Sequence, residues 1–496
     1  MGVRPTGGHA AVTDVVPVPT GTVTSWDHHA DVVIAGYGVA GAAAAVEAAR
    51  AGAEVLVLER SGSWGGAAAM AGGFIYLGGG TPIQTACGFT DSVDNMAAYL
   101  KAAMGPGADE RRIADYCAGS VAHFEWLIGC GVPFKAEFFD QPGWEPMGDE
   151  GLMYSGGENS YPFNTIADPA PRGHVPQMQN KKQGESSAGF MLMQGLVETA
   201  TAAGAQALYD VRVQALIVES DGRVVGVRAR RYGTTIDIRA RRGVVLATGS
   251  FAYNDDMVAR YAPRIAGRPA ASIEQHDGRA IRMAQALGAD LAHMDATEVA
   301  LFVDPQQLVR GVLVNERGQR FVAEDTYPGR VGQLTLYHQN NTAYLILDET
   351  AQAEAMASPS PQLMMRPPTW VCETVAELEA EIGLPSGSLQ STMAAYNDGA
   401  TEGRDPLLHK KSKWLRPLGS PIAAIDLRES TGGFTLGGLH TTLDAEVLHV
   451  SGDPIPGLFA AGRCSAGLAA WGYASGVSLG DGSFYGRRAG RAAARG

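Results

Sequence analysis

The sequence predicts an α/β fold in which two separated segments of the chain build one parallel sheet, with a mixed α/β domain inserted between them. Three observations predict it: a strand–helix–strand pattern in residues 31–59, a buried strand pattern in residues 243–247, and a return of high glycine density after residue 431. A chain of 496 residues is long enough for two to four domains.

The first pattern is a βαβ unit. Residues 31–35 form a short β-branched run that is typical of a buried strand. Residues 41–50 are rich in alanine and predict a helix that ends near Gly52, and residues 54–59 predict the second strand. Strand, helix and strand within about 30 residues form the unit that underlies parallel sheets.

The turn between the first strand and the helix has the spacing of a dinucleotide site. Gly36 permits the tight turn, Gly38 lets a pyrophosphate approach the backbone, and Gly41 allows close helix packing. The phosphates would then lie at the positive end of the helix, and Glu59 would accept hydrogen bonds from ribose hydroxyls. The combination predicts a Rossmann-like domain that binds FAD or NAD, because an acidic strand end disfavours NADP. A glycine-rich turn without a ligand is the alternative.

The remaining chain divides by pattern. Residues 211–242 predict an antiparallel meander, residues 277–289 a helix, and residues 290–430 a separate mixed α/β block. Residues 137–163 are loop-like and rich in aromatic side chains, which indicates either a pocket wall or a satellite core. The predicted domains are a flexible arm (1–28), the first segment of the nucleotide domain (29–275), an inserted α+β cap (276–432), and the C-terminal segment (433–496).

The composition limits the partners. A net charge of −13 and few charged residues (18%) argue against nucleic acid and against anionic membrane surfaces. No run of 18 apolar residues occurs, so we expect no stable membrane insertion. Five scattered cysteines and four histidines without metal-like spacing (His276, His293, His338 and His440) predict no metal site and a reducing, cytoplasmic location.

Several further motifs resemble the fumarate reductase and succinate dehydrogenase flavoprotein superfamily. They are the Trp64–Gly66 loop, residues 246–251, residues 275–278, residues 435–438 and residues 456–462. The resemblance implies an FAD that lies extended across the nucleotide domain while a cap covers its ring. Because the Trp64–Gly66 loop contains no histidine to which a flavin could be attached, we expect no covalent link. The cofactor residues that we expect are Gly36, Gly38, Val39, Ala40, Gly41, Glu59, Arg60, Gly65, Gly66, Ala67, Gly73, Val213, Ala247, Thr248, Gly249, Gly462, Arg463, Ser478 and Leu479.

The sequence departs from this superfamily where dicarboxylates would bind. Tyr473 stands at the position of the arginine that delivers a proton in fumarate reductases, and Phe434 stands where a clamping histidine would be. Aromatic side chains thus replace cationic ones. We therefore expect an apolar substrate with a neutral polar group.

A narrower resemblance fits that expectation. Residues 471–476 (Trp-Gly-Tyr-Ala-Ser-Gly) and 324–327 (Glu-Asp-Thr-Tyr) are similar to the 3-ketosteroid dehydrogenases of the Δ4-(5α) type. The resemblance implies that Tyr473 bonds the ketone oxygen, Ser475 accepts the proton, and Tyr327 passes that proton to solvent. We also expect free N–H groups at Gly476–Ser478, where the last helix begins, to face the flavin. Packing tyrosines without a catalytic role are the alternative.

The resemblance implies a steroid substrate and a separate, unidentified electron acceptor. Two enzyme functions on the same scaffold stay open, a 3-ketosteroid Δ1-dehydrogenase and an enone or fumarate-type reductase, and the position of the product double bond would separate them. A flavin-bearing binding or electron-transfer protein is the non-enzyme alternative. Only an enzyme would bleach its flavin when mixed with a 3-ketosteroid without oxygen.

Overall fold

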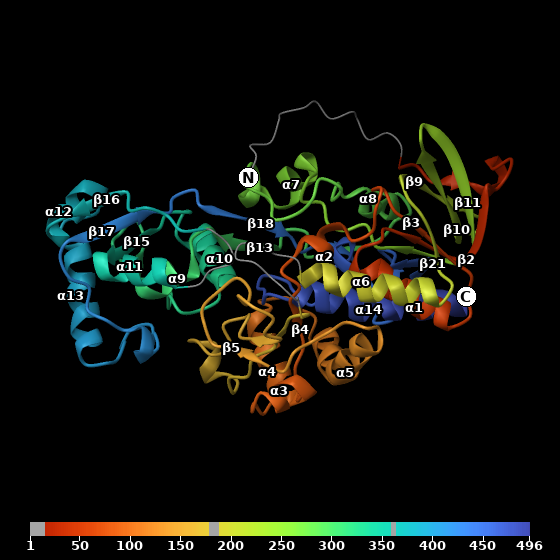
Figure 1. Ribbon diagram of the computed structural model, residues 1–496. Helices are drawn as coiled ribbons and strands as arrows, with labels where there is room; N and C mark the ends of the chain where they lie inside the picture. The colour runs from red at the N-terminus through yellow and green to blue at the C-terminus, as the bar shows by residue number, and fades with distance from the viewer. Residues whose placement is uncertain (1–14, 178–187, 359–363) are drawn as a thin grey trace.

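In the computed structural model, which describes residues 15–177, 188–358 and 364–496, a sheet of nine strands forms one end of the molecule (Figure 1). Its order is β1-β9-β10-β11-β2-β3-β8, and β21 adds to β11 and to β20. The predicted strand–helix–strand unit is confirmed as β2, α1 (Val39–Arg50) and β3. The strands are β1 (Val18–Pro19), β2 (His28–Ala35), β3 (Val55–Leu58), β8 (Gln206–Leu208), β9 (Val211–Val218), β10 (Val224–Arg231), β11 (Thr234–Leu246), β20 (Glu446–Leu448) and β21 (Pro454–Ala460).

The strand β11 joins two predicted elements into one. Its first half pairs antiparallel with β10, as the meander requires, its last residues pair parallel with β21, and β2 pairs parallel with it from Ile238 to Leu246. The register shifts between Ala240 and Gly243, and a Cβ at Gly243 would lie only 2.7 Å from the ring of Phe459. The bulge therefore lets one strand change neighbours and enter the parallel part of the sheet.

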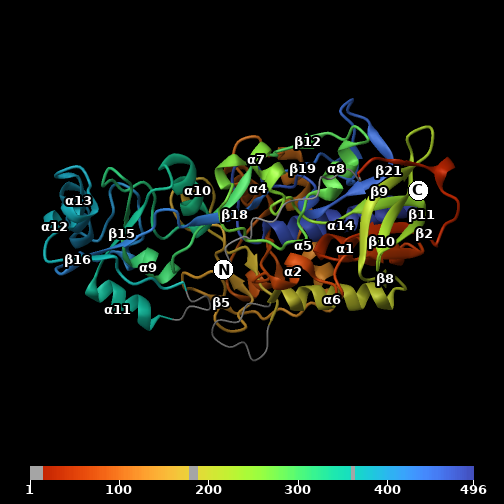
Figure 2. The same cartoon turned by 90° about the horizontal axis from the view of Figure 1, so that it is seen from above.

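The C-terminal helix α14 (Val477–Arg495) lies along α1, so both segments of the nucleotide domain share one layer (Figures 1 and 2). Gly490 permits the close approach, because a Cβ there would lie 2.2 Å from the carbonyl oxygen of Ala44. Arg487 and Arg491 both bond the buried Glu47 of α1. The helix is therefore buried along one side, where its small residues pack and two of its arginines pair.

Further helices and a small sheet lie above and below this layer in the view of Figure 1. The small sheet has the order β4-β7-β6-β5. No helix in the described ranges is long and apolar enough to cross a membrane. The remaining elements here are α2 (Gly66–Met70), β4 (Ile75–Tyr76), α3 (Pro82–Ala86), α4 (Val93–Ala103), α5 (Glu110–Gly129), β5 (Phe138–Phe139), β6 (Leu152–Met153), β7 (Gly173–His174), α6 (Ala188–Ala202), α7 (Asp255–Tyr261) and α8 (Arg279–Gln285).

The cap forms the opposite end of the molecule, and the ladder of β13 with β18 lies between the two ends (Figure 1). Its antiparallel sheet has the order β14-β15-β17-β16, and its own core runs from Leu301 to Leu427. Its elements are β13 (Thr297–Leu301), α9 (Pro305–Arg310), β14 (Val312–Val314), α10 (Pro328–His338), β15 (Tyr344–Asp348), α11 (Glu349–Ala357), β16 (Trp370–Cys372), α12 (Val375–Ile382), α13 (Ser388–Thr401), β17 (Ile422–Asp426) and β18 (Thr431–Thr435).

The predicted boundaries differ from the packing in two places. Helix α8, placed in the cap by the boundary at residue 276, contributes Ile281 and Met283 to the core of the large sheet, and the pair β12 (Leu291–Ala292) and β19 (Gly438–Leu439) follows it. Residues 18–28 of the predicted loose arm are ordered, because Val18 and Pro19 pair with β9. Residues 1–14 of that arm lie outside the described residues.

Candidate functional site

One cavity of about 490 Å³ connects the first βα turn with the cap. We call the part formed by Trp144, Glu298, Ala300, Phe302, Tyr327, Met364, Phe434, Tyr473 and Ser475 the ring end, and the part at the βα turn the dinucleotide end. All three expected catalytic residues line the ring end. The expected cofactor residues that line the cavity are Gly36, Gly38, Val39, Ala40, Glu59, Arg60, Gly66, Ala67, Gly73, Val213, Ala247, Thr248, Gly249, Gly462, Arg463, Ser478 and Leu479.

The glycines of the turn have different tasks. Gly36 has φ +101°, and a Cβ there would lie 2.4 Å from the carbonyl oxygen of Ala247. A Cβ at Gly41 would lie 2.0 Å from the carbonyl oxygen of Gly36, so Gly41 serves helix packing and does not line the cavity. Gly38 differs, since its φ is −84° and a Cβ would meet only Gly65, at 3.9 Å. The protein itself leaves the space at Gly38 open, as a bound pyrophosphate requires.

Glu59 and the start of α1 complete the dinucleotide end. The Glu59 carboxylate accepts the N–H of Tyr37 at 2.8 Å and the N–H of Ser61 at 2.7 Å. A carboxylate has about four acceptor positions, so two stay free for ribose hydroxyls. Because Gly38 caps a helix of twelve residues, that helix directs its N-terminal N–H groups to the cavity. These residues fit the dinucleotide part of FAD.

Gly65 and Asp277 shape the rim. Gly65 does not line the cavity, and its N–H donates to the carbonyl oxygen of Tyr37, which fixes the Trp64–Gly66 loop beside the turn. Asp277 accepts the N–H of Arg279 at the start of α8 and pairs with Arg60 at 3.1 Å. His276 lines the cavity, and burial lowers its pKa to about 4.

At the ring end, Tyr473 is held by the start of α14. Its hydroxyl donates to Oγ of Ser478 at 2.8 Å and accepts the Ser478 N–H at 3.2 Å. The ring of Phe434 meets the ring of Tyr473 edge-on at 5.7 Å. Burial raises the pKa of the Tyr473 phenol, which keeps it a neutral donor. The N–H of Ser478 is therefore not free for a flavin, contrary to the expectation, and the Val477 N–H donates to Ala474.

Ser475 is fixed through its backbone. Its N–H donates to the carbonyl oxygen of Ser155 at 3.1 Å, and the Ser155 hydroxyl donates to the carbonyl oxygen of Ser475 at 2.8 Å. The next carbonyl oxygen, of Gly476, accepts the N–H of Tyr76. The Ser475 side chain thus lines the cavity from a segment whose backbone is bonded on both sides.

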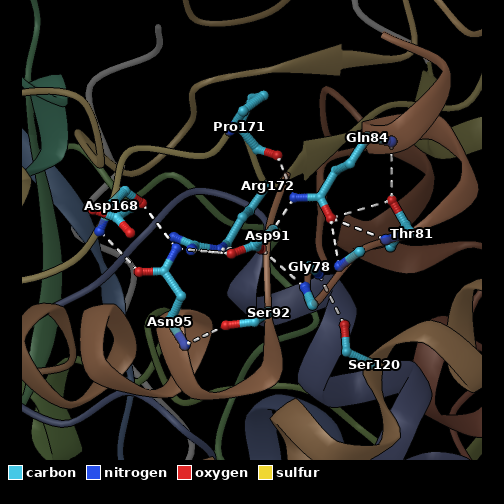
Figure 3. A network of polar contacts seen from close by, with 12 residues as sticks. Gly78, Thr81, Gln84, Asp91, Ser92, Asn95, Ser120, Asp168, Pro171 and Arg172 are labelled. Carbon is cyan, nitrogen blue, oxygen red and sulfur yellow. Dashed lines mark hydrogen bonds and ion pairs between the residues drawn. The ribbon is translucent and has the colours of Figure 1, made fainter. Parts of the chain in front are cut away.

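Figure 3 shows a buried ion pair between Arg172 and Asp91 and the polar groups around it. The Arg172 guanidinium donates to Asp91 at 2.7 and 2.9 Å, and both side chains are fully buried. Burial alone would raise the pKa of Asp91, but Arg172 holds it below its ordinary value. Asp91 also accepts the Gly79 N–H, and the Arg172 carbonyl accepts the Leu77 N–H. The pair thereby fixes the chain around Tyr76, which bonds the Ser475 segment.

Tyr327 lies at the start of α10 and contacts a residue that the sequence analysis missed. Its hydroxyl donates to Glu298 of β13 at 3.2 Å, and both side chains are buried. Burial raises the pKa of Glu298 to about 7, and burial also raises the pKa of Tyr327. A single carboxyl in the otherwise uncharged strand Thr297–Leu301 was the signal that could have identified Glu298.

Glu324, the first residue of the Glu-Asp-Thr-Tyr motif, anchors Tyr327. It accepts two hydrogen bonds from Arg320, at 2.9 and 2.7 Å, and Arg320 also bonds Asp405. Burial alone would raise the pKa of Glu324, but Arg320 and Lys410 hold it low. The carboxylate therefore stays charged and paired inside the cap, and it fixes the segment that leads to Tyr327.

The aromatic loop of residues 137–163 divides between two roles. Trp144 lines the main cavity, whereas Phe138 packs edge-on against Phe89 and Tyr154 at 4.8 and 5.6 Å. Trp144 and Tyr154 also line a second cavity of about 80 Å³, which shares Ser475 and Tyr327 with the main one. Part of the loop is thus a pocket wall and part is a satellite core.

The chain matches the family model described as FAD binding domain over residues 31–479. A solved structure, 3-ketosteroid-Δ4-(5α)-dehydrogenase from Rhodococcus jostii RHA1 in complex with 4-androstene-3,17-dione, is 65% identical, covers 97% of this chain and 99% of that chain, and has a TM-score of 0.95. The 3-oxo-5-alpha-steroid 4-dehydrogenase of Comamonas testosteroni is 28% identical over 91% of this chain and 96% of its own length. A flavocytochrome c3 fumarate reductase shares the fold at 24% identity and a TM-score of 0.67, covering 95% of this chain and 79% of that chain.

Proposed function

The chain belongs to the FAD binding domain family of flavoproteins, and within it to the group of the 3-ketosteroid-Δ4-(5α)-dehydrogenases, and from that premise we propose that it introduces a double bond between carbons 4 and 5 of 3-keto-5α-steroids. Its cofactor is FAD. The steroid loses two hydrogens, one as a proton from carbon 4 and one as a hydride from carbon 5. A separate electron acceptor must then remove the two electrons for the next turnover.

The observation that supports this proposal best is the set of side chains at the ring end. Tyr473 and Ser475 project into one cavity with Tyr327, and their neighbours Phe434 and Phe302 are apolar. Such a wall suits a flat apolar ligand with a neutral oxygen. Arg463 is the cation that also faces Tyr473, and it is already paired with Asp481 at 3.2 Å. A dicarboxylate would therefore find no free cation in the ring end as defined above.

The residues of the chain have separate tasks in this reaction. Tyr473 donates its hydroxyl to the ketone oxygen and so stabilises the negative charge that develops there when carbon 4 loses its proton. The Ser478 N–H donates to the phenol oxygen and holds it in place, and the phenol hydrogen must leave Oγ of Ser478 to reach the ketone oxygen. When FAD is bound, it supplies the acceptor for the hydride from carbon 5.

Ser475 is the group that we place against the proton of carbon 4. A hydroxyl is a weak base, so it must give up its own proton as it takes the new one. Tyr327, which lines the same two cavities as Ser475, is the acceptor for that proton. The backbone bonds of Ser475 to Ser155 keep its oxygen in a fixed position for the transfer.

Anaerobic mixing of the FAD-loaded chain with the saturated 5α parent of 4-androstene-3,17-dione tests the proposal. We expect the flavin absorbance to bleach and the steroid product to have its double bond between carbons 4 and 5. A double bond between carbons 1 and 2 would favour the Δ1-dehydrogenase alternative. A flavin that does not bleach would favour the non-enzyme alternative, in which the chain is a flavin-bearing binding or electron-transfer protein.

We also propose a reducing, cytoplasmic location, because all five cysteines are free thiols and three of them are buried. FAD is expected to be bound without a covalent link. Flavin that stays with the precipitated chain after acid treatment would contradict that part.

A further inference from the structure

We propose that Glu298 is the acceptor at the inner end of the proton path, so that a proton from carbon 4 of the steroid passes through Ser475 and Tyr327 and is held on the Glu298 carboxyl until the product leaves. This inference rests on the proposed function and adds a residue to it. Glu298 acts through Tyr327, so it is a positioning and proton-holding residue for the reaction.

The direction of one hydrogen bond supports this role. The Tyr327 hydroxyl donates to Oε1 of Glu298 at 3.2 Å. Because its hydrogen points to Glu298, the lone pairs of the Tyr327 oxygen are free to accept a hydrogen from another donor. Ser475 lines both cavities that Tyr327 lines, and we assign it as the donor on that side.

The burial of Glu298 also supports this role. Its side chain is 5% exposed and stands on β13 directly opposite Phe434 of β18. Tyr327 is the hydrogen-bond partner found for it among the described residues, and no ion pair with a lysine or arginine is found there. A buried carboxyl without a nearby cation has a lower free energy when it is neutral than when it is charged. Such a group is suited to hold a proton for part of a catalytic cycle.

The proton balance is complete without a further reagent. The bond from carbon 4 to its hydrogen breaks, and the proton goes to the Ser475 oxygen. Ser475 gives its hydroxyl proton to Tyr327, and Tyr327 gives its own to the Glu298 carboxylate. The result is a neutral Glu298 acid, a restored Ser475 and a restored Tyr327. Burial raises the pKa of Tyr327, so a tyrosinate is disfavoured and the proton moves on.

Among the neighbouring groups considered below, Glu298 is the one whose pKa lies near neutral pH. Burial raises the pKa of Glu298 to about 7 and raises those of Tyr327 and Tyr473 above their ordinary value near 10. His276, which lines the same cavity, has its pKa lowered by burial to about 4. Phe434, the partner on β18, does not titrate, and the guanidinium of Arg330 on α10 lies over the ring of Phe163. An inflection near neutral pH therefore reports Glu298.

The experiment compares the parent chain with Glu298→Gln and Glu298→Asp. Anaerobic single-turnover flavin reduction is followed from about pH 5 to about pH 9, a range that spans the pKa of the buried carboxyl. We expect the parent rate to rise through about pH 7, and Glu298→Gln to lose that inflection and about 100-fold in rate, with KM for the steroid near the parent value. Glu298→Asp should retain the inflection at an intermediate rate.

Glu379→Gln is the matched control, because Glu379 is a buried carboxyl of the cap that accepts backbone N–H groups at Gly387 and Leu389 and does not line the cavity. It should leave the pH profile unchanged. Infrared difference spectra of the steroid-free holoenzyme give a second measurement. A protonated carboxyl band that titrates near pH 7 should be present in the parent and missing in Glu298→Gln.

A Glu298→Gln enzyme that keeps the parent rate and the parent inflection would overturn the proposal, provided that the parent itself is active. An infrared band that survives in Glu298→Gln would overturn it as well, even where that variant folds poorly and turns over slowly. A parent chain that does not reduce its flavin with the steroid would instead contradict the proposed function.

Discussion

Tyr473 and Ser478 share two hydrogen bonds, one from the phenol to Oγ of Ser478 at 2.8 Å and one from the Ser478 N–H to the phenol at 3.2 Å. The pair fixes the one neutral donor that we assign to the steroid ketone. Tyr473→Phe removes that donor and should slow flavin reduction by about 100- to 1,000-fold. Stopped-flow single turnover measures the rate. Tyr485→Phe, on the same helix and outside the cavity, should reduce its flavin at the parent rate.

Ser475→Ala should abolish proton removal while leaving the flavin and the steroid bound, because the backbone bonds to Ser155 do not involve the side chain. Difference absorbance on steroid addition measures binding, and single turnover measures reduction. Tyr327→Phe should also block reduction near neutral pH and recover part of it at high pH, where solvent base is plentiful. If both variants reduce the flavin at the parent rate, the two residues only pack.

Gly38→Ala should weaken FAD binding and leave the folding of the FAD-free chain intact. Its φ of −84° allows alanine, and the added Cβ would meet only Gly65 at 3.9 Å, so the methyl group occupies space that we assign to the pyrophosphate. Fluorescence titration with FAD measures the affinity. Gly21→Ala is the matched control, since nothing lies within 4 Å of its Cβ. Equal FAD affinity in both variants would place the pyrophosphate elsewhere.

The aromatic loop offers a pair of variants with opposite expectations. Trp144→Ala should raise the steroid dissociation constant, because Trp144 lines the main cavity. Phe138→Ala should lower thermal stability and leave steroid affinity unchanged, because its ring packs on Phe89 and Tyr154. Thermal unfolding and steroid titration of both variants test this. The reverse pattern would show that Phe138 forms the pocket wall.

Glu298 should also make the stability of the chain depend on pH. Its pKa is raised from 4.5 to about 7 by burial, so the folded state binds its proton more tightly than the unfolded state does. That contribution is fully present below about pH 4.5 and is lost as pH rises through about 7, at a cost of about 3 kcal/mol. Glu298→Gln removes the effect. Denaturant unfolding at pH 5 and pH 8 should show a smaller loss of stability in Glu298→Gln than in the parent.

The parts of the fold that depend on neighbouring residues could be predicted from the sequence. The strands β2 and β3, the helix α1 and the turn at Gly36 follow from local patterns, and the structure has them. The parts that depend on distant partners could not. Strand β11 is continuous because its first half pairs with β10 and its last residues with β21, and α14 is buried because its glycines meet α1.

The candidate site shows the same limit. Motif resemblance was enough to select Tyr473, Ser475 and Tyr327, which lie far apart in the sequence and line one cavity. Glu298 was missed because its position beside Tyr327 depends on the packing of α10 on β13, which no local pattern reveals. A carboxyl in an apolar strand is a signal, but nothing local distinguishes a paired carboxylate from a proton acceptor.

Deuterium placed separately at two steroid carbons tests the desaturation between carbons 4 and 5. With deuterium at the 5α position, we expect slower flavin reduction and label transferred to the reduced flavin of the parent chain. With both hydrogens of carbon 4 replaced by deuterium, we expect one label to be lost to solvent, one to stay in the product and none to reach the flavin. Label that stays on carbon 5 of the product, or reduction whose rate neither deuterium changes, would contradict desaturation between carbons 4 and 5.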